Sequence, residues 1–213
     1  MKTQINEMRI QTFLNALGSN SPAPGGGAAA GLSGALGAAL GKMVAELTVG
    51  KQKYAAFSDH AQAVSDRLSL LMDRFALLAD ADAAAYSGYM DALALPKETE
   101  AQKTERRAAL QEAVHRATDV PCRVIEACGE TVDLLASLHR CSNPTCAGDL
   151  AAGAAEIETA AKIAWLNVLA NLPYFSDRTE AERIQADFRA MLSDLCGRCG
   201  ALYREIASSL EAK

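Results

Sequence analysis

Apolar side chains recur every three or four positions along almost the whole chain, and this spacing predicts helices. No stretch shows the strict alternation of apolar and polar residues that is typical of a half-buried strand. Helices are expected over residues 3–17, 27–47, 58–93, 98–120 and 148–172, with a last one from about residue 178 nearly to the C-terminus. Pro121 either bends the fourth helix or opens another that runs to residue 140. The pattern indicates an all-α fold, a single-domain bundle of long antiparallel helices over residues 1–213.

The expected helix ends carry their own signals. Gly50 marks the exit from the second helix, and Pro96 and Pro173 stop the third and the last but one. Asp177, followed by Glu180 three residues later, has the character of a capping box and opens the last helix. Loops are expected over residues 19–24 and 141–147, where prolines and small polar residues gather.

Composition narrows the class of protein. The chain has 213 residues, of which 50% are hydrophobic and only 5% aromatic, so a core built mainly from alanine and leucine and closely packed helices are expected. The net charge of −5 argues against a nucleic-acid partner, which would require a basic face. Any anionic ligand must therefore be met by local positive charge.

The second helix is apolar enough to raise the question of a membrane. Residues 25–41 carry no charge, but Lys42 and Glu46 interrupt the run before it reaches the length of a span. The apolar run also begins too late for a secretory signal. No membrane partner is expected.

Six cysteines, in a chain of this size without a secretory signal, favour a reduced, cytoplasmic setting over disulfides. Cys196 and Cys199 form a CxxC, but they fall within a helical run, residues 188–210, rather than at the start of a helix after a strand. Cys141 and Cys146 have no second pair suitably spaced to complete a zinc site. Structural thiols are favoured over redox or metal roles, and no metal is expected.

The most informative segment is the glycine-opened second helix. Gly25, Gly26 and Gly27 follow Pro24 at its start, where unpaired backbone N–H groups on a positive helix end favour a carboxylate or phosphate. Further glycines recur every three or four residues to Gly41 and allow another helix to approach closely. A purely structural, buried helix is the alternative interpretation.

Several blocks of residues together resemble a known family. They are Pro24-Gly25-Gly26-Gly27, residues 47–54 with Gly50-Lys51-Gln52-Lys53-Tyr54, Asp82 with Tyr86, Leu95-Pro96-Lys97, residues 143–149, and Asn167 with Asn171. In this order they resemble the cyclodeaminase/cyclohydrolase family of folate enzymes. The resemblance implies an all-helical homodimer that acts on one-carbon groups at N5 and N10 of tetrahydrofolate. It implies a folate substrate and no other cofactor.

The resemblance gives the lysines a role. Folate carries a glutamate tail, so an acidic protein that binds it needs local positive charge, which Lys51, Lys53, Lys97 and the glycine-opened helix end would supply, with Tyr54 beside them. On the alternative interpretation these lysines are solvated surface residues.

Asp82 is the candidate catalytic group. Hydrolysis of a methenyl bridge requires a positioned water, a base for its proton and a proton for the departing nitrogen. A carboxylate serves these steps and also stabilises a cationic ligand. Tyr86, four residues later, lies on the same helical face and would bond to Asp82 or to the ligand, whereas Asp80 points elsewhere.

For four other polar residues the sequence leaves two interpretations open. Asp149 either caps its helix or contacts substrate. Asn167 and Asn171 either tie helices together or bind the donors and acceptors of a pterin. Lys42 either extends to the surface or lies near the site with a perturbed pKa.

Three functions follow as hypotheses. Hydrolysis of 5,10-methenyltetrahydrofolate to 10-formyltetrahydrofolate leads, because the chain leaves no room for the formiminotransferase domain that some members carry. Cyclodeamination of formiminotetrahydrofolate, with release of ammonia, is the alternative. Ala28-Ala29-Ala30 and Gly148-Asp149-Leu150-Ala151-Ala152 depart from the family pattern, which keeps a third hypothesis open, a non-catalytic folate-binding helical protein.

Overall fold

A computed structural model describes residues 4–212, and within this range the chain is helical with no strand. The all-α prediction is confirmed. The α-helices are α1 (Ile10–Leu17), α2 (Gly26–Glu46), α3 (Ser58–Leu93), α4 (Glu100–Leu138), α5 (Ala147–Asn171) and α6 (Arg178–Glu211). Short 3-10 helices lie at η1 (Ile5–Glu7), η2 (Gln52–Phe57), η3 (Pro144–Cys146) and η4 (Leu172–Tyr174).

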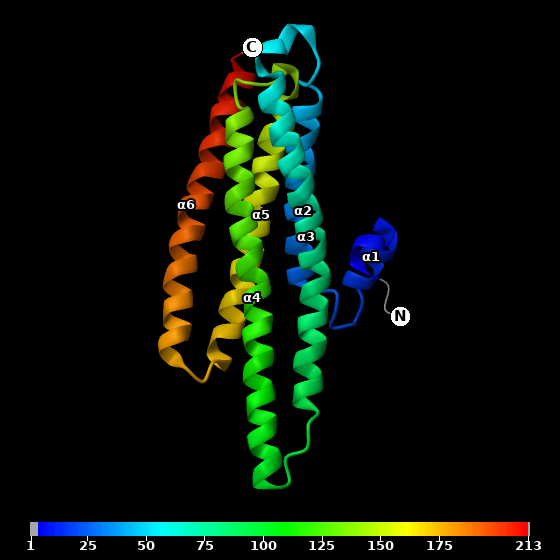
Figure 1. The fold of residues 1–213 in the computed structure, drawn as a ribbon, viewed down its shortest axis with the longest axis vertical. Helices are drawn as coiled ribbons and strands as arrows, with labels where there is room; N and C mark the ends of the chain where they lie inside the picture. Colours follow the sequence, from blue (N-terminus) through cyan, green and yellow to red (C-terminus); the bar gives the residue numbers. More distant parts are fainter. Residues whose placement is uncertain (1–3, 213) are drawn as a thin grey trace.

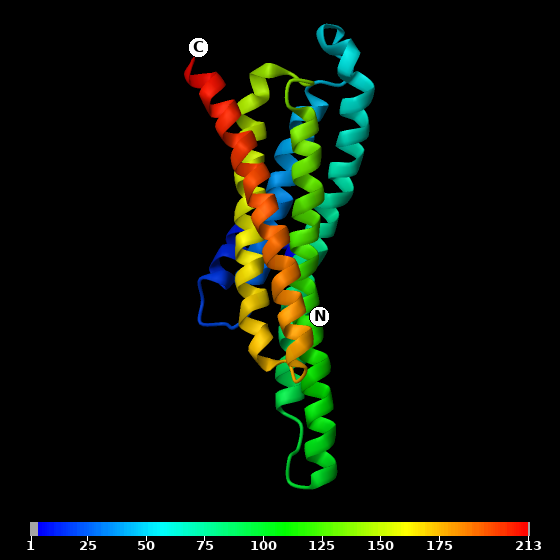
Figure 2. The same cartoon turned by 90° about the vertical axis from the view of Figure 1, so that its left-hand side faces the viewer.

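The long helices run antiparallel in an elongated bundle. In Figure 1, α3 and α4 lie in front of α2 and α5, and α6 packs along the other side of α5. Figure 2 shows the same arrangement from the side, with the α3–α4 hairpin reaching beyond the rest of the bundle. The short α1 stands off the bundle near the start of α2 (Figure 1). This arrangement places the N-terminus of α2 partway along the bundle, beside α3, α4 and α5.

Glycines let α3 and α5 pack closely against α2. A Cβ at Gly34 would come within 2.4 Å of the Phe75 ring, and one at Gly37 within 2.7 Å of Ile157. Atoms cannot come this close without overlapping. The close approach of α3 and α5 to α2 therefore requires glycine at these positions of α2. The predicted role of the glycine spacing in close helix packing is confirmed.

Most predicted helix ends agree with the structure. Gly50 has a φ of +67°, a left-handed conformation that suits glycine. Asp177 caps α6 by accepting hydrogen bonds from the N–H groups of Thr179 and Glu180. At α4, a capping box of Thr99 and Gln102 moves the start two residues beyond the predicted position.

The structure corrects the predicted first helix and decides between the two alternatives for Pro121. The predicted helix over residues 3–17 is interrupted, because Met8 and Arg9 have extended backbone and only Ile10–Leu17 is α-helical. Residue 3 lies outside the described residues. Pro121 opens no new helix, since it is buried inside the continuous α4.

The helix α2 is long and apolar enough to cross a membrane by length and composition, and half of its apolar window is buried inside the protein. The central helix of a bundle in water has the same properties, so this finding is weak evidence for a span. Most of the other residues of this helix are partly buried, and Leu36 and Met43 are its exposed large hydrophobic residues.

Candidate functional site

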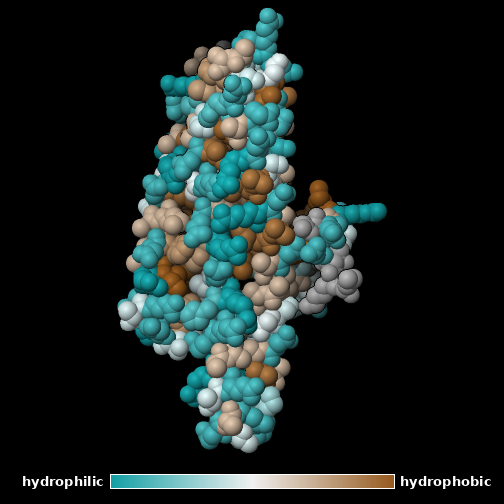
Figure 3. Space-filling view, viewed as in Figure 1, coloured by the Kyte–Doolittle hydropathy of each residue, from teal (hydrophilic) through white to brown (hydrophobic). Residues whose placement is uncertain are grey.

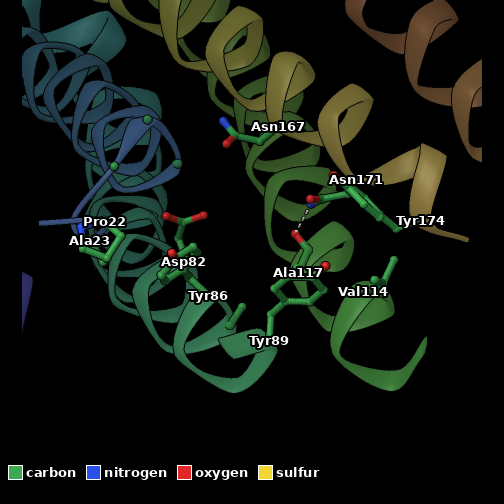
Figure 4. A pocket seen from close by; sticks show the side chains of 14 residues that line it. Pro22, Ala23, Asp82, Tyr86, Tyr89, Val114, Ala117, Asn167, Asn171 and Tyr174 are labelled. Atoms are coloured by element: carbon green, nitrogen blue, oxygen red, sulfur yellow. Dashed lines mark hydrogen bonds between the residues drawn. The ribbon is translucent and has the colours of Figure 1, made fainter. Parts of the chain in front are cut away.

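A cavity of about 310 Å³ opens at the N-terminus of α2, between α3, α4 and α5. Figure 4 shows its side chains converging from these elements. It is lined by Pro22, Ala23, Gly25, Gly26, Gly27, Asp82, Ala85, Tyr86, Tyr89, Val114, Ala117, Asn167, Asn171 and Tyr174. The structure thus brings together, from three distant segments, the three glycines, Asp82, Tyr86, Asn167 and Asn171 that the sequence had singled out. Their roles there stay predictions.

Asp82 is the ionisable centre of this cavity. Its half-buried side chain comes from α3 and lies against the first turn of α2, where it accepts a hydrogen bond from the N–H of Ala28. Burial raises the pKa of the Asp82 carboxyl above its ordinary value of 3.8, and the Ala28 hydrogen bond opposes this shift only in part. A carboxyl balanced in this way is suited to accept and return a proton.

The anion expected at the glycine-opened helix end is therefore, in this structure, a side chain of the protein. The N–H of Ala28, which has no hydrogen-bond acceptor within the first turn of the helix, donates to the Asp82 carboxylate. The start of α2 therefore positions Asp82, the candidate acid/base. The sequence interpretation had treated this helix end and Asp82 as two separate parts of the site.

Asn171 binds a backbone group that a proline has left unpaired. Pro121 lacks the N–H that would normally bond to the carbonyl four residues earlier, that of Ala117. Asn171 Nδ2 donates to this Ala117 oxygen at 3.0 Å (Figure 4). The predicted alternative that an asparagine ties helices together is thus what the structure shows for Asn171, between α5 and α4.

Asn167 has its amide nitrogen occupied as well. Its Nδ2 donates to the carbonyl of Ile163 in its own helix at 2.9 Å. Each of these amide nitrogens uses one of its two N–H donors in this way, so each asparagine still offers a ligand one donor and the amide oxygen as an acceptor. The Asp82 carboxylate is the one acidic group among the described lining residues, and no lysine, arginine or histidine is among them.

Tyrosines form the rim, and sequence reasoning found only one of them. Tyr86 is 37% exposed, Tyr174 is 59% exposed, and the rings of Tyr89 and Tyr174 lie 6.4 Å apart. Tyr89 follows Asp82 by seven residues, two helical turns, so its spacing was a usable signal. Tyr174 gave no such signal, because only the fold brings the end of α5 beside α3. The sequence also missed Pro22, Ala23, Val114 and Ala117.

A second cavity of about 730 Å³ adjoins the first and shares Pro22, Ala23 and Tyr86 with it. Pro24 lines this cavity rather than the first. Asp80 also lines it, as expected for a residue pointing away from Asp82, and accepts a hydrogen bond from the Ile5 N–H. The other Asp80 carboxylate oxygen is buried and has no hydrogen-bond partner among the described residues.

The remaining predicted site residues lie elsewhere. Lys51, Lys53 and Tyr54 belong to the segment after the C-terminus of α2, where Tyr54 Oη donates to Asn143 Oδ1 at 2.9 Å. Lys42 is half-buried in the last turns of α2, Asp149 lies in the first turn of α5, and Lys97 is exposed in the α3–α4 connection. None of them lines either cavity. Their part in ligand binding stays a prediction.

The cysteines agree with the structural interpretation. All six are free, and Cys196 and Cys199 lie inside α6. Burial raises the pKa of the Cys122 and Cys199 thiols to about 12. Among residues 4–212 no group of three or more histidine, cysteine or acidic side chains is arranged to hold a metal.

Comparisons with known proteins show which family the sequence is similar to. A sequence profile described as formiminotransferase-cyclodeaminase matches residues 9–190. A methenyltetrahydrofolate cyclohydrolase from Methylorubrum extorquens is 36% identical over 96% of both chains. A formimidoyltransferase-cyclodeaminase from Sus scrofa is 34% identical over 96% of this chain, which spans 37% of that longer protein.

Among solved structures, a formiminotetrahydrofolate cyclodeaminase from Thermotoga maritima is similar in fold. The TM-score is 0.81 over 95% of this chain and 99% of that one, with 24% identity. At this identity the likeness shows a shared fold.

Proposed function

Because the chain belongs to the formiminotransferase-cyclodeaminase family, we propose that it hydrolyses 5,10-methenyltetrahydrofolate to 10-formyltetrahydrofolate. The relative named methenyltetrahydrofolate cyclohydrolase matches over nearly its full length, which supports this activity over others in the family. The observation that carries the proposal is the composition of the cavity at α2.

That cavity suits a cation. The methenyl bridge joins N5 and N10 as an amidinium, which carries a positive charge. The carboxylate of Asp82 lines the space together with Asn167 and Asn171, whose amide oxygens can accept hydrogen bonds, and no cationic side chain is among the described lining residues. In a partly dry cavity these acceptors stabilise the bound cation and orient a water for attack. A volume of about 310 Å³ accommodates the ring system, with the tail outside.

The reaction needs only proton transfers. Water adds to the bridging carbon, a C–O bond forms, and Asp82 takes the released proton. The neutral adduct then forms the formyl C=O, its hydroxyl loses a proton, and the bond from carbon to N5 breaks as N5 is protonated. One proton is released overall. We therefore propose that no metal or redox cofactor takes part.

A decrease in the methenyltetrahydrofolate absorbance band tests this proposal. The wild-type protein should accelerate the loss of the band beyond the uncatalysed rate, and Asp82→Asn should accelerate it far less. Wild-type protein that binds the folate without accelerating its loss would support the non-catalytic folate-binding alternative instead.

Cyclodeamination is the second candidate, supported by the 34% identity to a formimidoyltransferase-cyclodeaminase across nearly the whole of this chain. N10 would attack the formimino carbon and ammonia would leave, with Asp82 moving the protons. With formiminotetrahydrofolate as substrate, this reaction should make the methenyltetrahydrofolate absorbance band increase. The same absorbance measurement therefore distinguishes the two activities, because the band decreases in hydrolysis and increases in cyclodeamination.

We also propose a homodimer that acts in the cytoplasm. The exposed Leu36 and Met43 on the otherwise apolar α2 support the first part. Six free cysteines support the second, since thiols persist in a reducing compartment.

A further inference from the structure

The cavity at the start of α2 has a polar end and an aromatic end. Asp82, Asn167 and the three glycines form the polar end, and Tyr89 and Tyr174 form the aromatic end (Figure 4). The carboxylate and the amide give the polar end a role in the proposed reaction. The two tyrosines have no part in that chemistry, although they come from different helical segments and meet at the mouth of the same cavity.

The backbone that carries Tyr174 is held against α4. Gln111 Nε2 donates to the Tyr174 carbonyl at 3.0 Å, and Gln111 Oε1 accepts a hydrogen bond from the Ser176 N–H at 2.8 Å. Phe175 is buried between them, and its ring centroid lies 4.6 Å from that of His115. Tyr174 is nevertheless 59% exposed. The segment therefore presents an accessible aromatic ring from a fixed backbone, which lowers the entropy cost of binding a ligand to it.

Tyr89 meets this ring from α3. It is half-buried, and its ring centroid lies 6.4 Å from that of Tyr174, with an angle of 59° between the two planes. A flat ring placed over this pair would stack on one tyrosine and meet the other edge to face, the two arrangements that aromatic rings prefer. The side of α3 and α4 seen in Figure 3 is mostly hydrophilic, with hydrophobic side chains scattered over it. Tyr89 and Tyr174 instead belong to the wall of the cavity.

We propose that Tyr89 and Tyr174 bind the aryl ring that N10 of the substrate carries, and that this aryl site selects folates over pterins that lack the ring. The aryl site rests on the proposed function, which places the reacting carbon at Asp82. N10 is bonded to that carbon and to the aryl ring, so the ring lies next to the reacting centre. Tyr89 follows Asp82 by two helical turns, about 10 Å along α3. A carboxylate contact, the aryl ring and a stacking contact together span about this distance.

The reverse orientation of the substrate fits the cavity less well. It would place the pterin, which carries several hydrogen-bond donors and acceptors, against two tyrosine rings, and the apolar aryl ring against Asn167 and the first turn of α2. The aromatic end also opens to solvent at Tyr174, so the glutamate tail attached to the aryl ring can leave the cavity there. Gln111 is not among the described lining residues. It holds the backbone of Tyr174 and is a positioning residue.

The binding of two matched ligands tests the aryl site without turnover. Tetrahydrofolate carries the aryl ring, whereas 6-methyltetrahydropterin has the reduced pterin without it. Tyr89→Ala and Tyr174→Ala should each weaken the binding of tetrahydrofolate about tenfold and leave that of 6-methyltetrahydropterin within about twofold of the wild type. Calorimetry in the absence of oxygen measures both affinities. A parallel loss for the two ligands, or an unchanged affinity for tetrahydrofolate, overturns the aryl site.

Control variants separate the ring from its surroundings, and circular dichroism checks that each is folded. Tyr174→Phe keeps the ring and should bind tetrahydrofolate within about twofold of the wild type. If it binds as weakly as Tyr174→Ala, the hydroxyl rather than the ring makes the contact, which overturns the stacking. Tyr203→Ala removes a 48% exposed tyrosine of α6 that is not among the described lining residues, and should change neither affinity.

Gln111→Ala tests the positioning role. It should weaken the binding of tetrahydrofolate and leave that of 6-methyltetrahydropterin unchanged, because it frees the backbone of Tyr174 without touching the polar end. A general loss of packing would weaken both ligands alike, and that result, or no loss at all, overturns the role of Gln111.

Turnover separates the aryl site from the proposed function. Tyr89→Ala and Tyr174→Ala should raise KM for 5,10-methenyltetrahydrofolate about tenfold with kcat within about twofold, because the aryl contact is present in the ground state and the transition state alike. Wild-type hydrolysis with unchanged KM in both variants overturns the aryl site alone. A wild type that binds tetrahydrofolate with the expected dependence on the tyrosines, yet does not hydrolyse the methenyl compound, overturns the proposed hydrolysis alone. A wild type that binds neither ligand overturns both.

Discussion

The Asp82 carboxylate occupies the space that a side chain on residue 27 would fill. A Cβ at Gly27 would lie 2.0 Å from Asp82 Oδ1, far inside van der Waals contact. Gly27 therefore lets the candidate acid/base lie against the first turn of α2, where the Ala28 N–H reaches it. The glycine acts through Asp82 and is a positioning residue.

Gly27→Ala should displace the Asp82 carboxylate and lower kcat by about 100-fold, since a displacement of about 1 Å at a reacting group has effects of this size. Turnover of 5,10-methenyltetrahydrofolate measures it. Gly34→Ala is the matched control, because its Cβ would lie 2.4 Å from Phe75 and should cost stability without moving Asp82. Equal loss of kcat per folded molecule in both variants would show that helix packing, rather than Asp82, sets the requirement.

Asp82→Asn should lower kcat by about 100-fold to 10,000-fold while the helical content stays unchanged, because an amide cannot take a proton from water. In the wild type, burial raises the pKa of Asp82, so kcat should rise with pH through a pKa above the ordinary 3.8. A pH profile corrected for uncatalysed hydrolysis measures this. Near-normal turnover in the variant would remove Asp82 from the mechanism.

The same residue should oppose stability at neutral pH. A carboxyl whose pKa is higher in the folded state than in the unfolded state adds stability below the unfolded value near 3.8, and this contribution is lost as pH rises through the folded pKa. Relative to the wild type, Asp82→Asn should therefore gain free energy of unfolding as pH rises from 4 to 7. Urea unfolding at both pH values measures the gain, and a constant difference would contradict it.

The sequence predicted the helices well because their periods and ends are local properties. Residues 58–93 were predicted as one helix and are one, bounded by the same residues. The site was predicted in part. Asp82 and Tyr86 share a helical face by spacing alone, but the partnership of Asn171 with Ala117 depends on α4 and α5 lying side by side. The glycine motif and the lysines of residues 51–53 are close in sequence, yet the length of α2 places them at opposite ends.

Asn171 and Pro121 should be energetically coupled. Asn171→Ala leaves the partly buried Ala117 carbonyl without its donor, and an acceptor left unpaired in this way costs about 1 kcal/mol, the low end of the range for buried groups. In Pro121→Ala the residue 121 N–H is restored and can bond to Ala117 within the helix, so there Asn171→Ala should cost less, with a coupling of about 1 kcal/mol. Denaturant unfolding of the wild type, both single variants and the double variant measures it. Additive losses would mean that Asn171 does not replace the missing helical hydrogen bond.

The thiols should differ in reactivity by burial. Cys128 and Cys199 are fully buried, and burial raises the pKa of Cys199 to about 12, so almost no thiolate forms near pH 8. Cys141 is partly accessible and lies in the connection before α5. In the folded protein, iodoacetamide should therefore modify Cys141 well before Cys128 or Cys199, and denaturant should equalise the rates. Peptide mass spectrometry over a time course measures the order. Early modification of Cys199 in the folded state would show that α6 opens from the bundle, since its packing against α4 and α5 is what keeps this thiol from water.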